Sequence, residues 1–557
     1  MLGTYDVLIA GATVYDGTGA PGRKADVAVK GGRIAEVGQN IQATAARRID
    51  AANLAVSPGF IDAHAHSEFG LFINPPGESQ VGQGITTEIA GQCGFSPFPL
   101  SSRACRHSFF WPDPRRPEWP ELDWQDAAGY FKRARSRGMG MNLVPFLGHL
   151  SARAEVVGDE DRPLLPAELR RLLQIIDDAL AQGAPGLSSG VAYKPSTAAD
   201  AAELTDCCRV LSRHGGVYAA HVRSYEAGAL AAVKEAVEVA AAAGVPLQVS
   251  HLSVAGRANW GQGAAAFEYI AAERRRGRRI TADVIPYPTQ GLWWGPRIVL
   301  PSRFKYDWRQ AWGPQARRIQ GELQAVDALE RLARELEAHP LTDEAAELKL
   351  RPEDLWAGLH IVSAGAAGAD LVGLPLEEAA ARRGVTPGRL WATLLAADGE
   401  AMGTVLFSTD EADFQAAARD PGTAFCTDTI ATSPDLVGAS FCGIQSHPRH
   451  WGTFPRVLGL YVREQGILTL PEAIRRMTAL PAATFGLTGR GVVRAGCWAD
   501  LVVFDPLRVG ERGTYTSAVA YPAGIEMVLV NGRIAYEAGR FTGELAGRLL
   551  TRDELSA

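Results

Sequence analysis

SPGFIDAHAHSEF, residues 57–69, is the first strand pattern of the long middle segment of the chain. A short apolar run passes through Pro58 and Gly59 and ends in two histidines, His64 and His66, separated by one residue. In an extended strand the side chains of residues i and i+2 point to the same face, so we expect both imidazoles to project together from a strand end. A single His-x-His pair is a weak signal, because the polar end of a buried strand can also carry one. Whether this pair binds a metal depends on which residues stand at the ends of the other predicted strands.

Seven further apolar runs follow, and Ala-rich amphipathic helical patterns such as those at 167–183 and 227–244 separate several of them. The eight strand candidates are GFIDAHAH (59–66), TTEIAGQCG (86–94), NLVPFLGH (142–149), GLSSGVAY (186–193), GGVYAAHVR (215–223), VPLQVSHL (245–252), RITADVIPY (279–287) and TAFCTD (423–428). About eight strand–helix units in about 420 residues favour an α/β fold, a (β/α)8 TIM-type barrel over residues 58–484. The spacing alone leaves an open doubly wound sheet as the alternative.

The two ends of the chain carry a different pattern, of short alternating strands. Gly31-Gly32 joins two such runs near the start and Asn531-Gly532 joins two near the end, and both dipeptides are typical of tight hairpin turns. Short strands alone cannot bury their apolar faces, so we expect residues 1–57 and 485–557 to form one small β-sandwich domain together.

Two stretches interrupt the barrel pattern, at about 102–123 and 290–350. The first is rich in proline and tryptophan, and the second contains a tryptophan-rich run followed by a charged helical segment. We expect both to be insertions after barrel strands, where substrate walls and lids tend to lie. The alternative is that they are surface loops that only pack on the barrel.

The composition limits the classes of partner. With 56 Lys and Arg residues against 62 Asp and Glu residues, the formal net charge of -6 gives no electrostatic reason to expect nucleic acid or an anionic membrane as a partner. No apolar run approaches the roughly 20 residues of a membrane span. The first residues lack the pattern of an export signal, so we expect a cytoplasmic protein. Seven scattered cysteines do not suggest a disulfide framework, and the sequence leaves open whether the chain forms a homo-oligomer.

Residues of the kind that bind metals stand at several predicted strand ends. Cys93 follows TTEIAGQ, His221 follows GGVYAA, His251 follows VPLQVS, and Asp428 follows TAFCT. The carboxyl ends of barrel strands meet at one face, so these side chains and the histidine pair are expected to form one site for one or two divalent ions. Imidazole and thiolate ligands favour zinc over magnesium or calcium.

The order of these residues resembles that of the metal-dependent amidohydrolase superfamily, and more closely that of the N-acyl-D-amino-acid deacylases (D-aminoacylases). The motifs that carry this resemblance cover nearly the whole chain, and they are PGFIDAHAH (58–66), GQCGFSP (91–97), GLSSGVAY (186–193), HVRSYE (221–226), SHLSVAGRANWG (250–261), DVIPYP (283–288), HPRHWGTFPRVLGLYVRE (447–464) and WADLVVFDP (498–506). In that family a cysteine takes the place of the carboxylated lysine of many amidohydrolases, and Cys93 fits this role.

The resemblance implies a zinc enzyme that hydrolyses a linear amide bond in a small-molecule substrate such as an N-acyl-D-amino acid. It implies one tight zinc site at Cys93, His221 and His251, and a weaker second site at the histidine pair with Cys93 bridging. A metal-activated water would attack the amide, with Asp428 acting first as general base and then as general acid. Hydrolysis of a cyclic amide or imide and deamination are alternatives on the same metal site. A noncatalytic amidohydrolase-like scaffold is the alternative from another class, and retention of all six ligand-type residues argues against it.

One departure from the family concerns the substrate carboxylate. Ser253 stands where the deacylases have a lysine that binds this group, and a serine offers only one weak donor, so the need for a free carboxylate is left open. Arg297, in the second insertion, is a candidate replacement for the lysine. The candidate substrate-binding residues are Tyr193, Tyr287, Ser253, Arg297 and His149. For the two tyrosines and Arg297 the alternative is simple packing, and for His149 it is that the side chain orients a loop.

Overall fold

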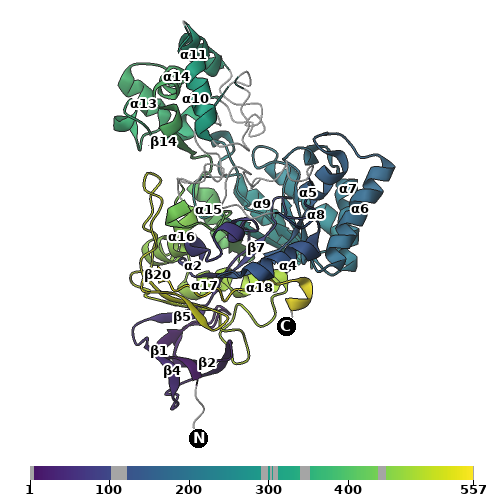
Figure 1. Cartoon of the computed structure of the whole chain (residues 1–557), viewed down its shortest axis with the longest axis vertical. Coiled ribbons are helices and arrows are strands. Elements are labelled where there is room, and N and C mark those ends of the chain that lie inside the picture. Colours follow the sequence, from purple (N-terminus) through teal and green to yellow (C-terminus); the bar gives the residue numbers. More distant parts are fainter. Residues whose placement is uncertain are drawn as a thin grey trace.

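A barrel of parallel strands forms the core of the protein in a computed structural model that describes residues 5–101, 122–289, 299–300, 304, 312–325, 327–338, 352–436 and 447–555 (Figure 1). The first arc of the barrel is the three-stranded sheet of β6 (Phe60–Asp62), β7 (Ile85–Ala90) and β8 (Asn142–Pro145). The second arc is the six-stranded sheet of β9 (Leu147–Gly148), β10 (Gly186–Gly190), β11 (Val217–His221), β12 (Leu247–Val249), β13 (Ile280–Val284) and β16 (Thr423–Phe425).

The two arcs close on each other at both edges. β8 runs almost directly into β9, and beyond β16 the Asp428 amide donates to the His64 carbonyl at 2.9 Å. Each of the eight predicted strand segments overlaps an observed strand, and the predicted α/β barrel is confirmed. All neighbouring pairs within the six-stranded arc are parallel, so their carboxyl ends open toward one face.

Helices on the outside of the barrel cover its strands. They are α4 (Ala127–Arg137), α5 (His149–Val157), α6 (Pro166–Ala181), α7 (Ala201–Arg213), α8 (Ala229–Ala243), α9 (Gly263–Arg275), α15 (Glu411–Arg419), α17 (Leu470–Met477) and α18 (Ala479–Phe485). α6 shows why they lie there: its buried residues Leu172, Ile175, Ile176, Ala179 and Leu180 recur at the spacing of one helix face. Among the described residues, every helix is too short or too polar to span a bilayer.

Strands from both chain ends meet in one nine-stranded sheet beside the barrel. Its order is β20 (Arg540–Phe541), β19 (Arg533–Glu537), β18 (Ile525–Val530), β17 (Leu501–Phe504), β5 (Ala55–Pro58), β1 (Tyr5–Val14), β2 (Arg23–Lys30) and β3 (Arg33–Gly38), with β4 (Ala45–Asp50) paired to β1. β17 pairs antiparallel with β5 and so joins the two ends (Figure 1). Both predicted hairpin turns are present, with left-handed φ at each turn residue, and the predicted small β domain from both ends is confirmed.

A further group of helices, from teal to green at the top of Figure 1, stands away from the barrel and has its own hydrophobic core. It consists of α10 (Trp312–Glu322), α11 (Ala328–Ala338), α12 (Pro352–Gly358), α13 (Leu376–Arg383), α14 (Pro387–Asp398) and the antiparallel pair β14 (Leu359–Ser363) and β15 (Gly403–Leu406). Trp391 is buried at its centre, where its indole donates to the Val299 carbonyl at 2.9 Å. The sequence did not predict the β14–β15 pair.

Candidate metal centre

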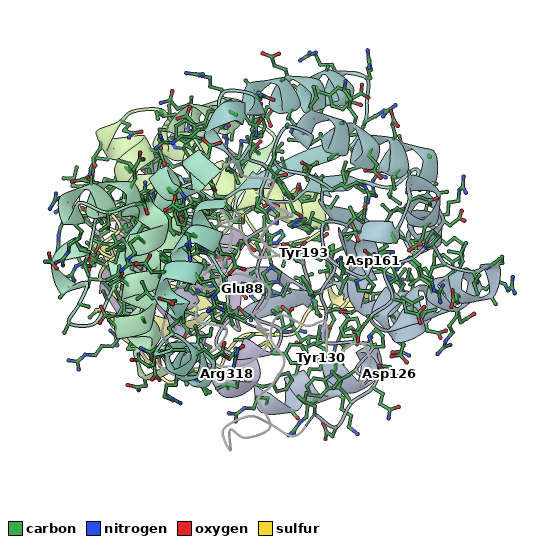
Figure 2. All side chains as sticks on the ribbon, turned by 90° about the horizontal axis from the view of Figure 1, so that it is seen from above. Glu88, Asp126, Tyr130, Asp161, Tyr193 and Arg318 are labelled. Atoms are coloured by element: carbon green, nitrogen blue, oxygen red, sulfur yellow. The ribbon has the colours of Figure 1, made fainter. Side chains whose placement is uncertain are left out.

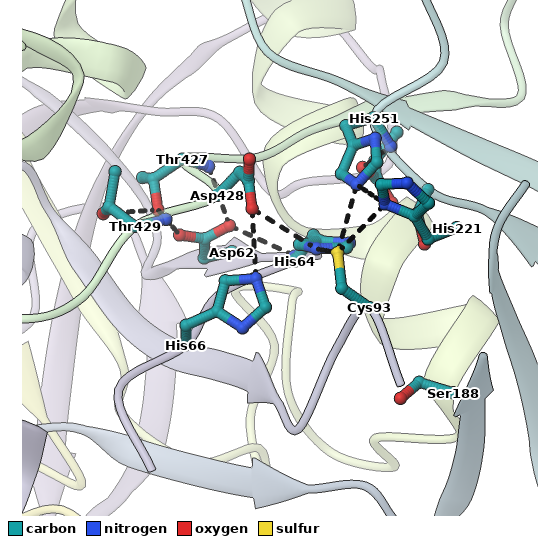
Figure 3. A network of polar contacts seen from close by, with 12 residues as sticks. Asp62, His64, His66, Cys93, Ser188, His221, His251, Thr427, Asp428 and Thr429 are labelled. Atoms are coloured by element: carbon teal, nitrogen blue, oxygen red, sulfur yellow. Dashed lines mark hydrogen bonds and ion pairs between the residues drawn. The ribbon is translucent and has the colours of Figure 1, made fainter. Parts of the chain in front are cut away.

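Four buried side chains converge at the carboxyl end of the barrel strands (Figure 3). One ligand-type atom from each of His64, Cys93, His251 and Asp428 lies within 4.8 Å of the other three, and we call these four residues the metal centre. The Cys93 Sγ atom lies 3.2 Å from His64 Nε2 and 3.2 Å from His251 Nε2. These four residues, predicted from separate strand ends, therefore form one metal site.

The two other predicted ligands border the metal centre on opposite sides. His221 Nδ1 lies 3.4 Å from Cys93 Sγ and 3.1 Å from His251 Nε2. His66 Nε2 lies 3.1 Å from Asp428 Oδ1, and His64 Nε2 lies 3.5 Å from the same oxygen. The structure thus brings all six predicted residues together. Their side chains form a row of contacts that runs from His221 through Cys93 to Asp428.

The histidine pair differs from the prediction in its backbone. β6 ends at Asp62, so His64 and His66 lie in the loop after the strand and not within it. The loop is held by main-chain bonds, from Ala65 N to the Ile89 carbonyl at 3.0 Å and from His66 N to the Thr429 carbonyl at 2.8 Å. These bonds, and not strand alternation, bring the two imidazoles to one side.

Three residues of the metal centre have a left-handed backbone. φ is 55° at Cys93, 31° at His251 and 50° at Asp428, values that residues other than glycine seldom adopt. Each of them follows a barrel strand closely, and the sharp turn directs the side chain inward across the mouth. Such strain persists only where the surrounding contacts fix it, and it is concentrated here at the site.

Glycines beside Cys93 let its turn pack closely on the neighbouring strands. Gly94 has a φ of 78°, and a Cβ atom there would lie 2.7 Å from the Gly190 amide nitrogen. Gly91 has a φ of 73°, and a Cβ atom there would overlap the Phe146 carbonyl. The motif GQCG is therefore required by the backbone as well as by the thiol.

Buried carboxylates behind the metal centre hold the backbone of two ligands. Asp62 accepts from the His64 amide at 3.2 Å and from the Thr427 amide at 3.0 Å. Asp283 accepts from the His251 amide at 2.6 Å and from Gln248 Nε2 at 2.7 Å. Burial is the main cause that raises the pKa of Asp283, to about 6.

The electrostatics keep the imidazoles of His64, His221 and His251 neutral and Asp428 charged. Burial is the main cause that lowers the pKa of His251 to about 4, and it lowers the pKa of His64 and His221 well below the usual value. Burial also disfavours the charged form of Asp428, but the Arg449 guanidinium, a hydrogen bond from His66 and the nearby imidazoles outweigh it and hold the pKa of Asp428 far below its usual range. Neutral imidazole is the form that binds a metal ion.

The donor set fits a zinc ion. Atoms bound at about 2.0–2.3 Å around one tetrahedral ion are about 3.3–3.7 Å apart, and the sulfur–nitrogen separations around Cys93 are 3.2–3.4 Å. A thiolate with imidazoles suits zinc better than magnesium or calcium, which prefer oxygen ligands. These buried polar atoms can therefore act together as the ligands of a zinc ion.

The predicted substrate-binding residues lie in different surroundings. Tyr193, near the middle of the view from above (Figure 2), packs its ring 4.6 Å from the His221 ring. Ser253 donates to the carbonyl of His251 at 3.2 Å, within its own loop. The Tyr287 hydroxyl donates to Glu511, a residue that follows β17, and the Arg456 guanidinium lies 4.6 Å from the centre of its ring.

His149 contacts residues outside the metal centre. His149 is fully buried, and its ring nitrogens contact Glu203 Oε1 at 3.0 Å and Ser196 Oγ at 3.3 Å. These contacts fix the start of α5 to α7, through Glu203, and to the loop after β10, through Ser196. Arg297 lies outside the described residues.

Arg449, at the start of α16 (Arg449–Arg456), is a site residue that the sequence reasoning missed. Its side chain is fully buried, and its Nη1 atom lies 3.5 Å from Asp428 Oδ2. Within the described part of the chain, none of its three side-chain nitrogens has a hydrogen-bond partner. A buried guanidinium that keeps its donors unused is unusual, and it offers them to an anionic group bound beside Asp428. The available signal was its place in HPRHWGTFPRVLGLYVRE (447–464), one of the motifs that carry the family resemblance.

Comparison with known proteins gives consistent matches over the whole chain. A model described as "Amidohydrolase family" matches residues 47–289 and 428–536. The chain is 32% identical to the D-aminoacylase of Alcaligenes xylosoxydans xylosoxydans, over 98% of this chain and 98% of that protein. The crystal structure of N-acyl-D-glutamate deacylase from Bordetella bronchiseptica, complexed with zinc and a phosphonate inhibitor that mimics the tetrahedral intermediate, matches with a TM-score of 0.75 and 29% identity, over 99% of this chain and 100% of that one. A D-aminoacylase structure described by one-metal activation and second-metal attenuation of its binuclear centre matches with a TM-score of 0.74 and 31% identity, over 98% of this chain and 100% of that one.

Proposed function

The chain belongs to the amidohydrolase family, and from this premise we propose that it deacylates N-acyl-D-amino acids or closely related N-acyl compounds. It is a metal-dependent amidohydrolase similar to D-aminoacylase, and its relatives at 32% identity act on different acyl amino acids. The observation that carries the substrate proposal is Arg449, whose side-chain nitrogens lie beside Asp428 and have no hydrogen-bond partner among the described residues. A substrate that carries a carboxylate next to its amide bond fits both features of the site. The metal position would bind the amide carbonyl, and the Arg449 cation would bind the carboxylate.

We assign the tight zinc position to Cys93, His221 and His251. The weaker second position is assigned to His64 and His66, with the Cys93 thiolate shared and Asp428 at its edge. Zinc bound in such a site supplies a water of pKa about 7 and polarises the substrate carbonyl. The D-aminoacylase relative with a binuclear centre, in which the second metal attenuates activity, supports two positions of unequal importance.

Zinc binding should release one proton from Cys93. Burial, and next the Asp428 carboxylate, raise the pKa of the free thiol well above its usual value, whereas the imidazoles are already neutral at pH 7. The ion must displace the thiol proton and no imidazole proton, so the apparent affinity should rise about tenfold per pH unit between about pH 6 and pH 8. Competition with a chelator at several pH values measures this slope, and an affinity that does not change with pH would contradict the thiol assignment.

Asp428 is assigned to proton transfer. Its carboxylate is charged over the working pH range, and His66 Nε2 at 3.1 Å and Arg449 Nη1 at 3.5 Å orient it from two sides. It takes a proton from the attacking water and passes it to the amide nitrogen as the carbon–nitrogen bond breaks, so that the products are a carboxylic acid and a free amine.

A hydrolysis panel tests the substrate class. We expect release of acetate from N-acetyl-D-amino acids, little release from the L forms, and little turnover of five- and six-membered cyclic amides or imides. Activity confined to cyclic amides, or to amides without a free carboxylate, would reject the proposal and favour the alternative that Ser253 leaves open. A zinc-loaded protein that hydrolyses no member of the panel would also reject it.

Replacing Arg449 should affect charged substrates selectively. Loss of hydrogen bonds to a charged group costs about 1.5–3 kcal/mol, so Arg449→Gln should raise KM for N-acetyl-D-amino acids by about 10- to 100-fold. Arg449→Lys, which keeps the charge but not the paired donors, should lie between Arg449→Gln and the wild type. The matched substrate is the corresponding N-acetyl-D-amino acid amide, which keeps the acetyl group but lacks the carboxylate. An equal loss on both substrates would show that Arg449 acts only through Asp428.

A further inference from the structure

The turn that carries Cys93 has two main-chain groups that its own backbone does not pair. We call residues 91–94, Gly-Gln-Cys-Gly, the cysteine turn; φ is left-handed at Gly91, Cys93 and Gly94. Its ends are the Gly91 carbonyl and the Gly94 amide, both deep in the barrel mouth. The side chain of Ser188, on β10, reaches both of them. Ser188 is labelled below Cys93 in Figure 3.

The Ser188 hydroxyl uses its donor and an acceptor position on this one turn. It donates to the Gly91 carbonyl at 2.6 Å and accepts from the Gly94 amide at 3.0 Å. A hydroxyl has one donor and can accept as well, so a single side chain can close the turn across its ends. We propose that Ser188 is a positioning residue of the metal centre, which fixes the cysteine turn so that the Cys93 sulfur faces its histidine partners.

The strand that carries Ser188 is shaped to receive the turn. Residues two apart on a strand share a face, so Ser188 and Gly190 both meet the cysteine turn. A Cβ atom at Gly190 would overlap the Cys93 carbonyl, so the glycine provides the space and the serine provides the bonds. The Ser151 amide, in α5, donates a third hydrogen bond to this turn, to the Gly94 carbonyl at 3.0 Å.

The opposite face of the same strand offers a matched comparison. Ser189 is as buried as Ser188, at 1% against 0% exposure, and its hydroxyl contacts the Tyr218 hydroxyl at 2.7 Å. Ser188→Ala and Ser189→Ala therefore remove the same group from equally buried positions. Only the first removal leaves the Gly91 carbonyl and the Gly94 amide without their partner.

The consequence concerns metal affinity first. Without the hydroxyl the strained turn can relax, and a small rotation at Cys93 moves its sulfur away from His221 and His251, to which it lies within 3.4 Å. Loss of a group that orients a metal ligand costs about 10- to 100-fold in metal affinity. We expect a loss of this size in Ser188→Ala, no such loss in Ser189→Ala, and partial rescue in Ser188→Thr, which restores the hydroxyl.

The first measurement is zinc affinity by chelator competition, together with the thiolate-to-metal absorption band of the cobalt-substituted full-length protein. The band reports the sulfur–metal bond directly, and we expect it to be weaker or shifted in Ser188→Ala alone. Equal zinc affinity and equal spectra in wild type, Ser188→Ala and Ser189→Ala would overturn the proposal. So would equal losses in both alanine variants, because that result describes general destabilisation.

The second measurement uses metal-free protein and so does not depend on the proposed hydrolysis. Hydrogen exchange of a peptide covering the cysteine turn should be at least about tenfold faster in Ser188→Ala than in wild type, because the Gly94 amide has lost its acceptor. Ser189→Ala should match the wild type in this peptide. Unchanged exchange would reject the role of Ser188 even if no zinc were bound, and a failed substrate panel would leave this result untouched.

Discussion

Replacing Cys93 with alanine should give a folded protein that has lost its tightly bound zinc, with kcat/KM reduced at least about a thousandfold. The sulfur is the atom that joins the two halves of the site, since it lies 3.2 Å from His64 Nε2, 3.2 Å from His251 Nε2 and 3.4 Å from His221 Nδ1. Without the sulfur the tight position keeps only the imidazoles of His221 and His251, and the two metal positions have no shared ligand. Metal analysis by mass spectrometry and steady-state kinetics measure the two losses.

Cys497→Ala is the matched control for this variant. Cys497 is also a free buried cysteine, with the same 3% exposure, but it lies in the core of the β domain. It should keep both zinc and activity. His66→Ala should keep the tight zinc as well, because His66 contacts Asp428 and belongs to the weaker position. Retention of one zinc per chain in Cys93→Ala would refute the assignment of the thiolate to the tight position.

The barrel could be predicted because its strands are short, apolar and bounded by clear signals. GGVYAAHVR and VPLQVSHL each follow an amphipathic helix and a glycine, and β11 and β12 lie within them. The hairpins at the chain ends could be predicted from Gly31-Gly32 and Asn531-Gly532 for the same reason. β14 and β15 could not, because they are short runs separated by two helices and their pairing depends on a core that exists only after those helices pack.

The metal centre could be predicted in its composition but not in its backbone. Ligand-type residues at several strand ends pointed to one face of the barrel, and that face is where they meet. The left-handed conformation of Cys93, His251 and Asp428 has no sequence signal of its own, because residues other than glycine reach it only when tertiary contacts enforce it. Arg449 could not be predicted as a site residue, because an arginine side chain is seldom fully buried and is expected at the surface.

Replacing Asp428 with asparagine should separate proton transfer from metal binding. The variant keeps the shape of the side chain and an oxygen for His66 and the metal, but an amide cannot accept a proton from water. General acid–base catalysis contributes about 10²- to 10⁴-fold, so kcat should fall by that factor while zinc content stays at the wild-type level. An amide does not become a proton acceptor when the pH rises, so raising the pH should not restore the variant.

The control for this variant is Asp398→Asn, which neutralises a carboxylate of similar exposure far from the metal. Asp398 is 8% exposed against 7% for Asp428, and it accepts from the Ala367 and Gly368 amides in the outer group of helices. It should leave kcat unchanged within about twofold, because surroundings away from the reacting atoms affect stability and not proton transfer. Near-normal turnover in Asp428→Asn would remove Asp428 from proton transfer. Loss of zinc together with turnover would instead identify Asp428 as a metal ligand.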